Sequence, residues 1–173
     1  MSTWNIDSVH STIGFKVKHL MVSTVRGSFT SFTGAIESPD DSFVGASAQF
    51  SAETKSVTTH NDMRDGHLRS ADFFDVEQFP TLSFTSHSFV KNGDAYAVAG
   101  ELTMHGVTKP VTLTAELGGI GAGMDGKRVV HFAASGKISR NEFGLMYSAM
   151  LETGGMVVGD EITLDLEVEA IEA

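Results

Sequence analysis

The chain has 173 residues, which suits one domain of ordinary size (residues 1–173) and would be cramped for two. With 12 basic residues, 22 acidic residues and no cysteine, it lacks the clustered Lys and Arg on which nucleic-acid binding depends, and it can form neither disulfides nor thiolate metal sites. No apolar run approaches the roughly 18 residues of a membrane-spanning helix, and residues 1–4 do not begin a secretory signal; we expect a cytoplasmic protein, or a periplasmic or secreted one if a signal has been removed.

Alternating apolar and polar residues predict strands along most of the chain. The pattern begins at Ile13, Phe15 and Val17, with lysines on the opposite face. It returns in five further segments, at residues 46–52, 96–104, 111–117, 130–138 and 162–168. Each segment predicts a strand with one buried and one solvated face.

Turn residues separate these segments. Asn92-Gly93 predicts a tight type I′ hairpin, because both central positions of that turn need positive φ. Asp125-Gly126 predicts a second hairpin, with the glycines at residues 118–123 lengthening its loop. The three prolines, Pro39, Pro80 and Pro110, are expected at breaks between strands.

Residues 54–80 lack the alternation and predict a helical insertion. Asn61 can cap a helix that continues to Leu68, with acids in the first turn complementing the helix dipole. Ser70 can begin a second short turn that holds Phe73 and Phe74.

Eight or nine short strands with one helical insertion predict a sandwich or a barrel. A barrel of about eight antiparallel strands either fills its interior with side chains or holds one small ligand. Small residues on the inward faces leave room for a ligand, although a sandwich core also mixes small and large residues; these are Ala46, Ala48, Gly100, Ala115, Ala134 and Gly136.

Histidines supply the candidates for chemistry. His60 and His67 lie two helical turns apart, which allows a small enzyme or a metal site, but the spacing is loose for zinc and no third ligand is evident. A polar helix held by Asp–Arg pairs is the favoured interpretation, with no metal. His19 continues an inward face, as a core residue or as a contact to the polar end of a ligand. Asp7, His10 and Ser11 are too close on one extended stretch to form a nucleophilic triad.

Several motifs follow one another in a recognisable order. They are Asp7-Ser8-Val9-His10-Ser11 with Phe15 and His19, Val25-Arg26-Gly27-Ser28-Phe29, residues 64–75 and 79–80, residues 100–111, residues 139–144 and the turn at 159–161. In this order and composition the chain resembles the YceI-like family of lipid-binding proteins over almost its whole length.

The resemblance implies an all-β fold with a short helical insertion, an extended antiparallel eight-stranded lipocalin-like β-barrel. Such a barrel would bind a long apolar chain (a polyisoprenoid, a quinone tail or a fatty-acid derivative) as carrier, store or sensor, with no enzymatic activity and no other cofactor. A ligand-free interaction barrel, for example a homodimer, is the alternative.

The ligand-binding residues fall into three groups. The tail would lie against Phe15, Val17, Phe29, Phe132, Ile138 and Phe143. Leu68, Phe73 and Phe74 would close one end. By resemblance and inward parity, the polar end would meet His19, Arg26, His67 or Arg140, since an arginine can grip a pyrophosphate with two hydrogen bonds. Arg26 and Arg140 could equally serve as structural ties between loop and strand.

Overall fold

The computed structural model describes residues 1–20, 22–147 and 158–173. Within these ranges the chain forms antiparallel strands, one α-helix and two short 3₁₀ helices, η1 (Thr54–Ser56) and η2 (Asn141–Phe143). The α-helix, α1, covers Asp62–Arg69. The strands are β1 (Ser2–Ile6), β2 (Thr12–His19), β3 (Ser23–Phe29), β4 (Phe32–Ser38), β5 (Ser47–Glu53), β6 (Val57–Thr58), β7 (Thr81–Asn92), β8 (Ala95–Met104), β9 (Val107–Ala122), β10 (Arg128–Ser139) and β11 (Val158–Glu172).

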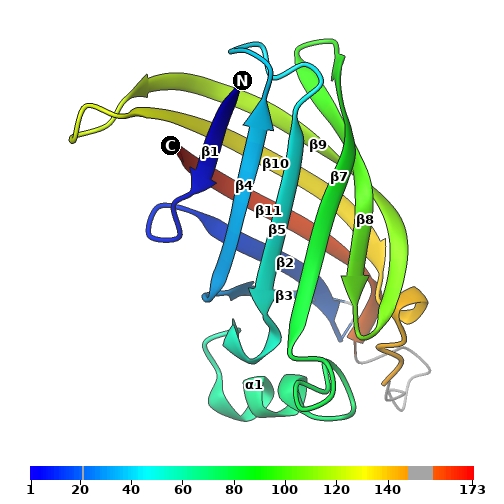
Figure 1. Cartoon of the computed structure of the whole chain (residues 1–173). Coiled ribbons are helices and arrows are strands. Elements are labelled where there is room, and N and C mark those ends of the chain that lie inside the picture. The colour runs from blue at the N-terminus through cyan, green and yellow to red at the C-terminus, as the bar shows by residue number, and fades with distance from the viewer. Residues whose placement is uncertain (21, 148–157) are drawn as a thin grey trace.

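The sheet closes on itself as an eight-stranded barrel. Its order runs β1-β4-β5-β7-β8-β9-β10-β11, and β11 pairs back onto β1 (Figure 1). Strand β11 is long enough to pair with β1 at Ala170–Glu172 and with β2 at residues 158–167. Strands β1 and β2 therefore share one position of the barrel, and β3 and β6 extend the sheet beyond β2. The predicted all-β antiparallel barrel with one short helix is confirmed.

The two predicted hairpins form, but with different turns. Asn92 pairs with Ala95, so the central residues are Gly93 and Asp94, and Gly93 has positive φ while Asn92 does not. That is a type II′ arrangement in place of the predicted type I′. The second hairpin turns at Asp125-Gly126, but β9 continues to Ala122, so Gly118, Gly119 and Gly121 extend a strand and only Gly123 belongs to the loop.

Pro110 corrects another expectation, because it lies inside β9 opposite Glu101. Strand β10 pairs with β9 only from Thr114 onward, so Pro110 faces an edge of the sheet that β10 does not occupy. A missing N–H therefore costs no ladder hydrogen bond there.

The helical insertion forms as predicted. The side chain of Asn61 accepts a hydrogen bond from the Arg64 N–H at 3.0 Å and caps α1. After the helix, the Phe73 N–H donates to the Ser70 carbonyl, which makes the short turn expected at Ser70. None of the helices in the described ranges is long and apolar enough to span a membrane.

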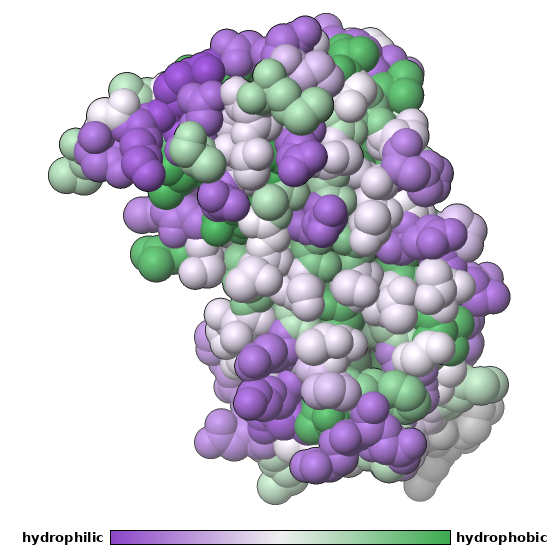
Figure 2. All heavy atoms as spheres, viewed as in Figure 1, coloured by the Kyte–Doolittle hydropathy of each residue, from purple (hydrophilic) through white to green (hydrophobic). Residues whose placement is uncertain are grey.

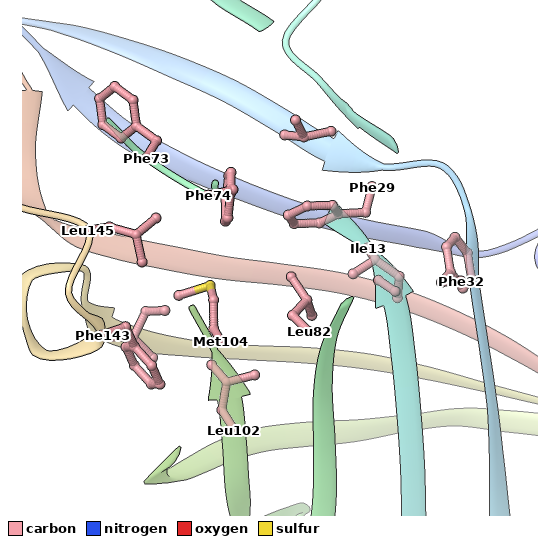
Figure 3. Packing of buried hydrophobic residues seen from close by; sticks show 13 residues of the cluster. Ile13, Phe29, Phe32, Phe73, Phe74, Leu82, Leu102, Met104, Phe143 and Leu145 are labelled. Carbon is pink, nitrogen blue, oxygen red and sulfur yellow. The ribbon is translucent and has the colours of Figure 1, made fainter. Parts of the chain in front are cut away.

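The buried apolar residues form two clusters along the barrel axis. One lies toward α1 and includes Phe29, Phe74, Leu82 and Met104, whose side chains approach one another from separate strands and from the turn after α1 (Figure 3). The other, which we call the aromatic plug, contains Trp4, Phe43, Tyr96 and Phe132. Trp4 and Phe43 are fully buried with ring centroids 5.6 Å apart. The plug closes the end of the barrel opposite α1.

Candidate functional site

An internal cavity of about 230 Å³ lies between the two clusters and extends toward α1. Its walls come from all eight barrel positions, with Leu68 of α1 and the turn after it at one end. An engineered apolar cavity of about 150 Å³ already stays dry and admits an aromatic guest. The barrel interior is thus incompletely filled by its own side chains.

The lining is almost wholly apolar. Among the described lining residues, only Gln49 and Arg140 have side chains with polar atoms. The aromatic lining residues are Phe15, Phe29, Phe50, Phe73, Phe74, Phe84, Phe89 and Phe132. A polar ligand in this lumen would lose its hydrogen bonds to water without replacement, at a cost of several kcal/mol per group. The cavity therefore favours a hydrocarbon.

Small residues make the room, but not all those predicted. Ala48, Ala115 and Ala134 line the cavity, and the last two face each other as partners on β9 and β10. Gly100 and Gly136 do not. A Cβ on Gly100 would lie 2.7 Å from the Phe84 ring, and one on Gly136 would lie 2.8 Å from Leu113. Gly136 accommodates a neighbouring side chain, and Gly100 accommodates the backbone of Thr85 and Ser86 as well as the Phe84 ring. Ala46 belongs to the cluster around the aromatic plug.

The helical end of the cavity is held by buried hydrogen bonds. Asp65 is 3% exposed and accepts hydrogen bonds from the backbone N–H of Thr59, at 2.8 Å, and from its hydroxyl. Burial alone would raise the pKa of Asp65, but the hydrogen bonds from Thr59 and the charge of Arg69 act against it, and the net pKa is lowered. Arg69 donates to the carbonyls of Lys55 and Val57. These bonds fix α1 so that Leu68, Phe73 and Phe74 line the cavity.

Arg140 is 4% exposed and its guanidinium is committed to backbone carbonyls. Nε donates to Gly159 at 2.8 Å, Nη1 to Leu145 and Tyr147 at 2.7 Å each, and Nη2 to Val158 at 3.1 Å. Burial lowers the pKa of Arg140, since it penalises the charged form. This geometry favours the structural tie over a headgroup contact, although the side chain also lines the cavity.

Nine of the thirteen predicted ligand-binding residues line the cavity. They are Phe15, Val17, Phe29, Leu68, Phe73, Phe74, Phe132, Ile138 and Arg140. Lining is compatible with a binding role and does not test it, so these assignments stay predictions.

The other four lie outside the lining. His19 ends β2, opposite Ser23 and Val158, and Arg26 is exposed on β3. His67 Nε2 donates a 2.8 Å hydrogen bond to the Asp72 carboxylate, and the ring packs edge-on against Phe73. Phe143 is buried in η2. His19 ends its strand beyond the residues that line the cavity.

Some residues that line the cavity were not predicted from the sequence. Leu82, Phe84 and Phe89 all come from β7, where the register shifts between Ser86 and Ser88. Because of this shift, the side chains that point into the barrel have even residue numbers before the bulge and odd residue numbers after it. The alternation within each half of β7 could have revealed these residues, but only once the bulge was known.

The histidine hypothesis for an enzyme finds little geometric support in the described residues. His60 precedes the cap of α1, has φ 60° and is exposed, so it shares no helix face with His67. Neither residue lines the cavity.

Asp7 and His10 do converge, against expectation. Residues 7–11 turn rather than extend, and His10 Nδ1 lies 2.7 Å from Asp7 Oδ2. The Ser11 hydroxyl, however, bonds the backbone of Glu169 and not His10. The three residues therefore do not form a triad.

Fold and cavity together define a class of protein, a closed antiparallel eight-stranded β-barrel that encloses an apolar lumen. The chain belongs to the YceI-like domain family, whose sequence pattern matches residues 4–170. The curated relatives include the UPF0312 protein SAB2563 of Staphylococcus aureus (strain bovine RF122 / ET3-1), which is 35% identical over 170 residues, 98% of this chain and 97% of the relative.

Solved structures share the fold. The YCEI protein of Campylobacter jejuni is 33% identical, covers 90% of each chain and superposes with a TM-score of 0.77. BcnA of Burkholderia cenocepacia is 22% identical with a TM-score of 0.82, over 95% of this chain and 98% of BcnA. A polyisoprenoid binding domain from Saccharophagus degradans, implicated in plant cell wall breakdown, is 15% identical with a TM-score of 0.65 over 98% of each chain.

Proposed function

We propose that this protein binds a long apolar chain of the polyisoprenoid type in its barrel lumen, and that it acts as a carrier, store or sensor rather than an enzyme. The observation that carries the proposal is the apolar cavity of about 230 Å³ between the aromatic plug and α1. The polyisoprenoid-binding name of a structural neighbour supports the same ligand class. A quinone tail or a fatty-acid derivative would suit the lining equally well.

The energetics suit a ligand without specific polar contacts. Burial of hydrocarbon is worth about 0.8 kcal/mol per CH₂, so one five-carbon isoprene unit contributes roughly 3–4 kcal/mol gross. Ordering of the tail and lost translational freedom offset much of this gain. A few buried units therefore suffice for micromolar binding, and the lumen would select its guest by width and length.

The decisive experiment is native mass spectrometry of protein purified without detergent. A lipid adduct is expected on the wild-type protein. In Ala134→Phe, a ring projects into the lumen beside Ala115, and the adduct should be lost. Ala133→Phe is the matched control, because Ala133 is the next residue on β10 and is outside the cavity lining.

Both variants should keep the wild-type far-ultraviolet circular dichroism spectrum. Loss of the adduct in both, or its retention in both, would place any bound lipid outside the lumen. A wild-type protein that stays free of adduct after incubation with polyprenyl phosphate would favour the ligand-free interaction barrel. The cytoplasmic location and the homodimer stay predictions.

A further inference from the structure

The charges of this acidic chain are unevenly distributed. Residues 8–36 contain Lys16, Lys18 and Arg26 but none of the 22 acidic residues. All three side chains belong to the hairpin of β2 and β3, which we call the basic hairpin (residues 12–29). The rest of the molecule is strongly acidic, so the basic hairpin is a local exception in a chain of net charge −10.

The cations of the basic hairpin form no ion pairs within the described residues. Lys16 lies directly opposite Arg26, a like-charge pair that is unfavourable for strand pairing. Lys18 reaches only the hydroxyl of Thr24, at 3.5 Å.

Neighbouring acids on β11 are directed elsewhere. Glu161 pairs with Lys137 at 3.4 Å, and Asp160 accepts from the Ser139 hydroxyl. Asp165 lies opposite Gly14, diagonal to Lys16, and forms no salt bridge with it. Fold stability therefore does not account for this clustering of positive charge.

The tip of the basic hairpin adds exposed apolar side chains. Leu20 is 41% exposed and Val22 is 84% exposed, on either side of Met21, which lies outside the described residues. The tip is close to the α1 end of the barrel, where β2 ends beside the start of β11 (Figure 1). Val17 and Val158, which flank this tip in the sheet, both line the cavity. Cationic side chains next to exposed apolar residues suit the boundary between lipid headgroups and acyl chains.

We propose that the basic hairpin docks the protein on an anionic lipid bilayer. This inference rests on the proposed function, since a lipid-binding lumen needs access to membranes. Each Lys or Arg near an anionic surface is attracted to it, and the acidic remainder is repelled. Approach through the basic hairpin is therefore favoured, and strand β2 of this hairpin also carries Val17 of the cavity lining.

Protection of a sheet edge is the competing explanation. Strand β6 covers β3 only at Ser28 and Phe29, so residues 23–27 of β3 have no partner on that side in the described chain. A charged side chain on an edge strand discourages pairing with other chains. This explanation accounts for Arg26 but not for Lys16 and Lys18, which lie on the inner strand of the hairpin.

The test is co-sedimentation with two kinds of vesicle, phosphatidylcholine alone and phosphatidylcholine mixed with phosphatidylglycerol. The wild-type protein should bind the mixed vesicles at least tenfold more strongly, and binding should weaken as salt rises past about 0.15 M. The triple variant K16Q/K18Q/R26Q should lose at least tenfold of this affinity. The control K91Q/K109Q/K127Q removes the same charge from exposed lysines on β7, on β9 and in the β9–β10 connection, and should bind like wild type.

Tip variants Leu20→Ser and Val22→Ser should weaken binding several-fold without abolishing its salt dependence. Equal affinity for both vesicles, or an equal loss in both triple variants, would overturn the proposal. So would a triple variant that differs from wild type only by concentration-dependent self-association, which would favour edge protection.

Native mass spectrometry of the same samples separates the two proposals. A wild-type protein that carries lipid but does not bind anionic vesicles refutes docking alone. A wild-type protein that binds vesicles without a lipid adduct refutes lumen binding alone.

Discussion

Gly27 shows how one residue shapes the lumen. It lies opposite Phe15 in the β2–β3 pairing, and a Cβ at this position would come within 2.4 Å of the Phe15 ring. The far end of the ring lies over the glycine, in the space that a Cβ would occupy. Its φ is not positive, so glycine is needed here for space and not for backbone conformation.

We therefore expect Gly27→Ala to displace the Phe15 ring and to destabilise the fold by about 1–3 kcal/mol, as overpacking usually does. Lipid occupancy measured by native mass spectrometry should also fall, because Phe15 lines the cavity. Gly66→Ala is the control: nothing lies within 4 Å of that position in α1, and alanine should raise helix stability by about 0.5–1 kcal/mol. Unchanged urea midpoints for both variants would contradict this view of Gly27.

Arg140 is the second residue on which the site depends. Four backbone carbonyls from two separate segments accept its hydrogen bonds, so its loss leaves several buried acceptors without partners. Arg140→Met should lower the free energy of unfolding by about 2–4 kcal/mol, measured by urea denaturation. Arg140→Lys should rescue little, because an ammonium cannot reproduce the planar fork.

The two roles left open for Arg140 predict different lipid affinities. If it is a structural tie, the folded fraction of Arg140→Met should bind a neutral polyprenol and a polyprenyl phosphate with the same relative affinity as wild type. A selective loss of the phosphate would instead assign Arg140 to the headgroup.

At the scale of elements, the connection between β1 and β2 holds two strands onto β11. The Asp7 N–H donates to the Glu169 carbonyl, and Ser11 bonds the same residue. His10 spans this connection. The hydrogen bond to Asp7, then the charges of Asp7 and Glu169, raise the pKa of His10, and the bond to His10 lowers the pKa of Asp7.

The raised pKa of His10 predicts how stability depends on pH. Stabilisation by the protonated imidazole is fully present below the unfolded pKa of about 6.5 and is lost as pH rises through the folded pKa. The melting temperature of wild type should exceed that of His10→Gln most at pH values below about 6.5, and the gap should narrow on the alkaline side. In an Asp7→Asn background this variation should shrink, because only the charge of Glu169 then raises the pKa of His10; variation of undiminished size would contradict the pairing.

Local patterns predicted most elements because alternation and capping act over a few residues. Asn61 capped its helix, and the strand around Phe15 placed its inward face correctly. A bulge broke this logic in β7, since one extra residue reverses the inward side. Pro110 was misplaced for a related reason: whether a strand edge is paired depends on the neighbouring strand, which the local sequence does not specify.

The residues of the site were predictable where the alternation along a strand places them, and less predictable where tertiary contacts place them. Phe132 and Ile138 share one face of β10 and line the cavity together. Arg140 follows on the same strand end, but its carbonyl partners come from residues 145–159, and no spacing rule brings these together. The positions of Gly100 and Gly136 likewise depend on the rings and methyl groups of adjacent strands.

At the scale of the whole molecule, the polar outer face of the barrel contrasts with the apolar lining of its lumen. In Figure 2 the face over β4, β5 and β7 is mostly pale to purple, with green in small areas, and strongly hydrophilic residues gather toward both ends. The outer positions of β5 and β7 are largely Ser and Thr, such as Ser47, Ser51 and Thr85. The apolar lining of the lumen between the plug and α1 contrasts with this outer face.

An incompletely filled lumen predicts that bound lipid stabilises the fold. A ligand that binds only the folded state adds about 2.7 kcal/mol when its free concentration is a hundred times the dissociation constant. For a chain of this size, that corresponds to a melting temperature about 5–10 °C higher. Protein refolded after organic extraction should therefore melt lower than native protein, and polyprenyl phosphate should restore the difference. Ala134→Phe, with its lumen blocked, should melt at one temperature with or without lipid, whereas Ala133→Phe should respond like wild type. A restored melting temperature in Ala134→Phe would mean that the stabilising lipid binds somewhere other than the cavity.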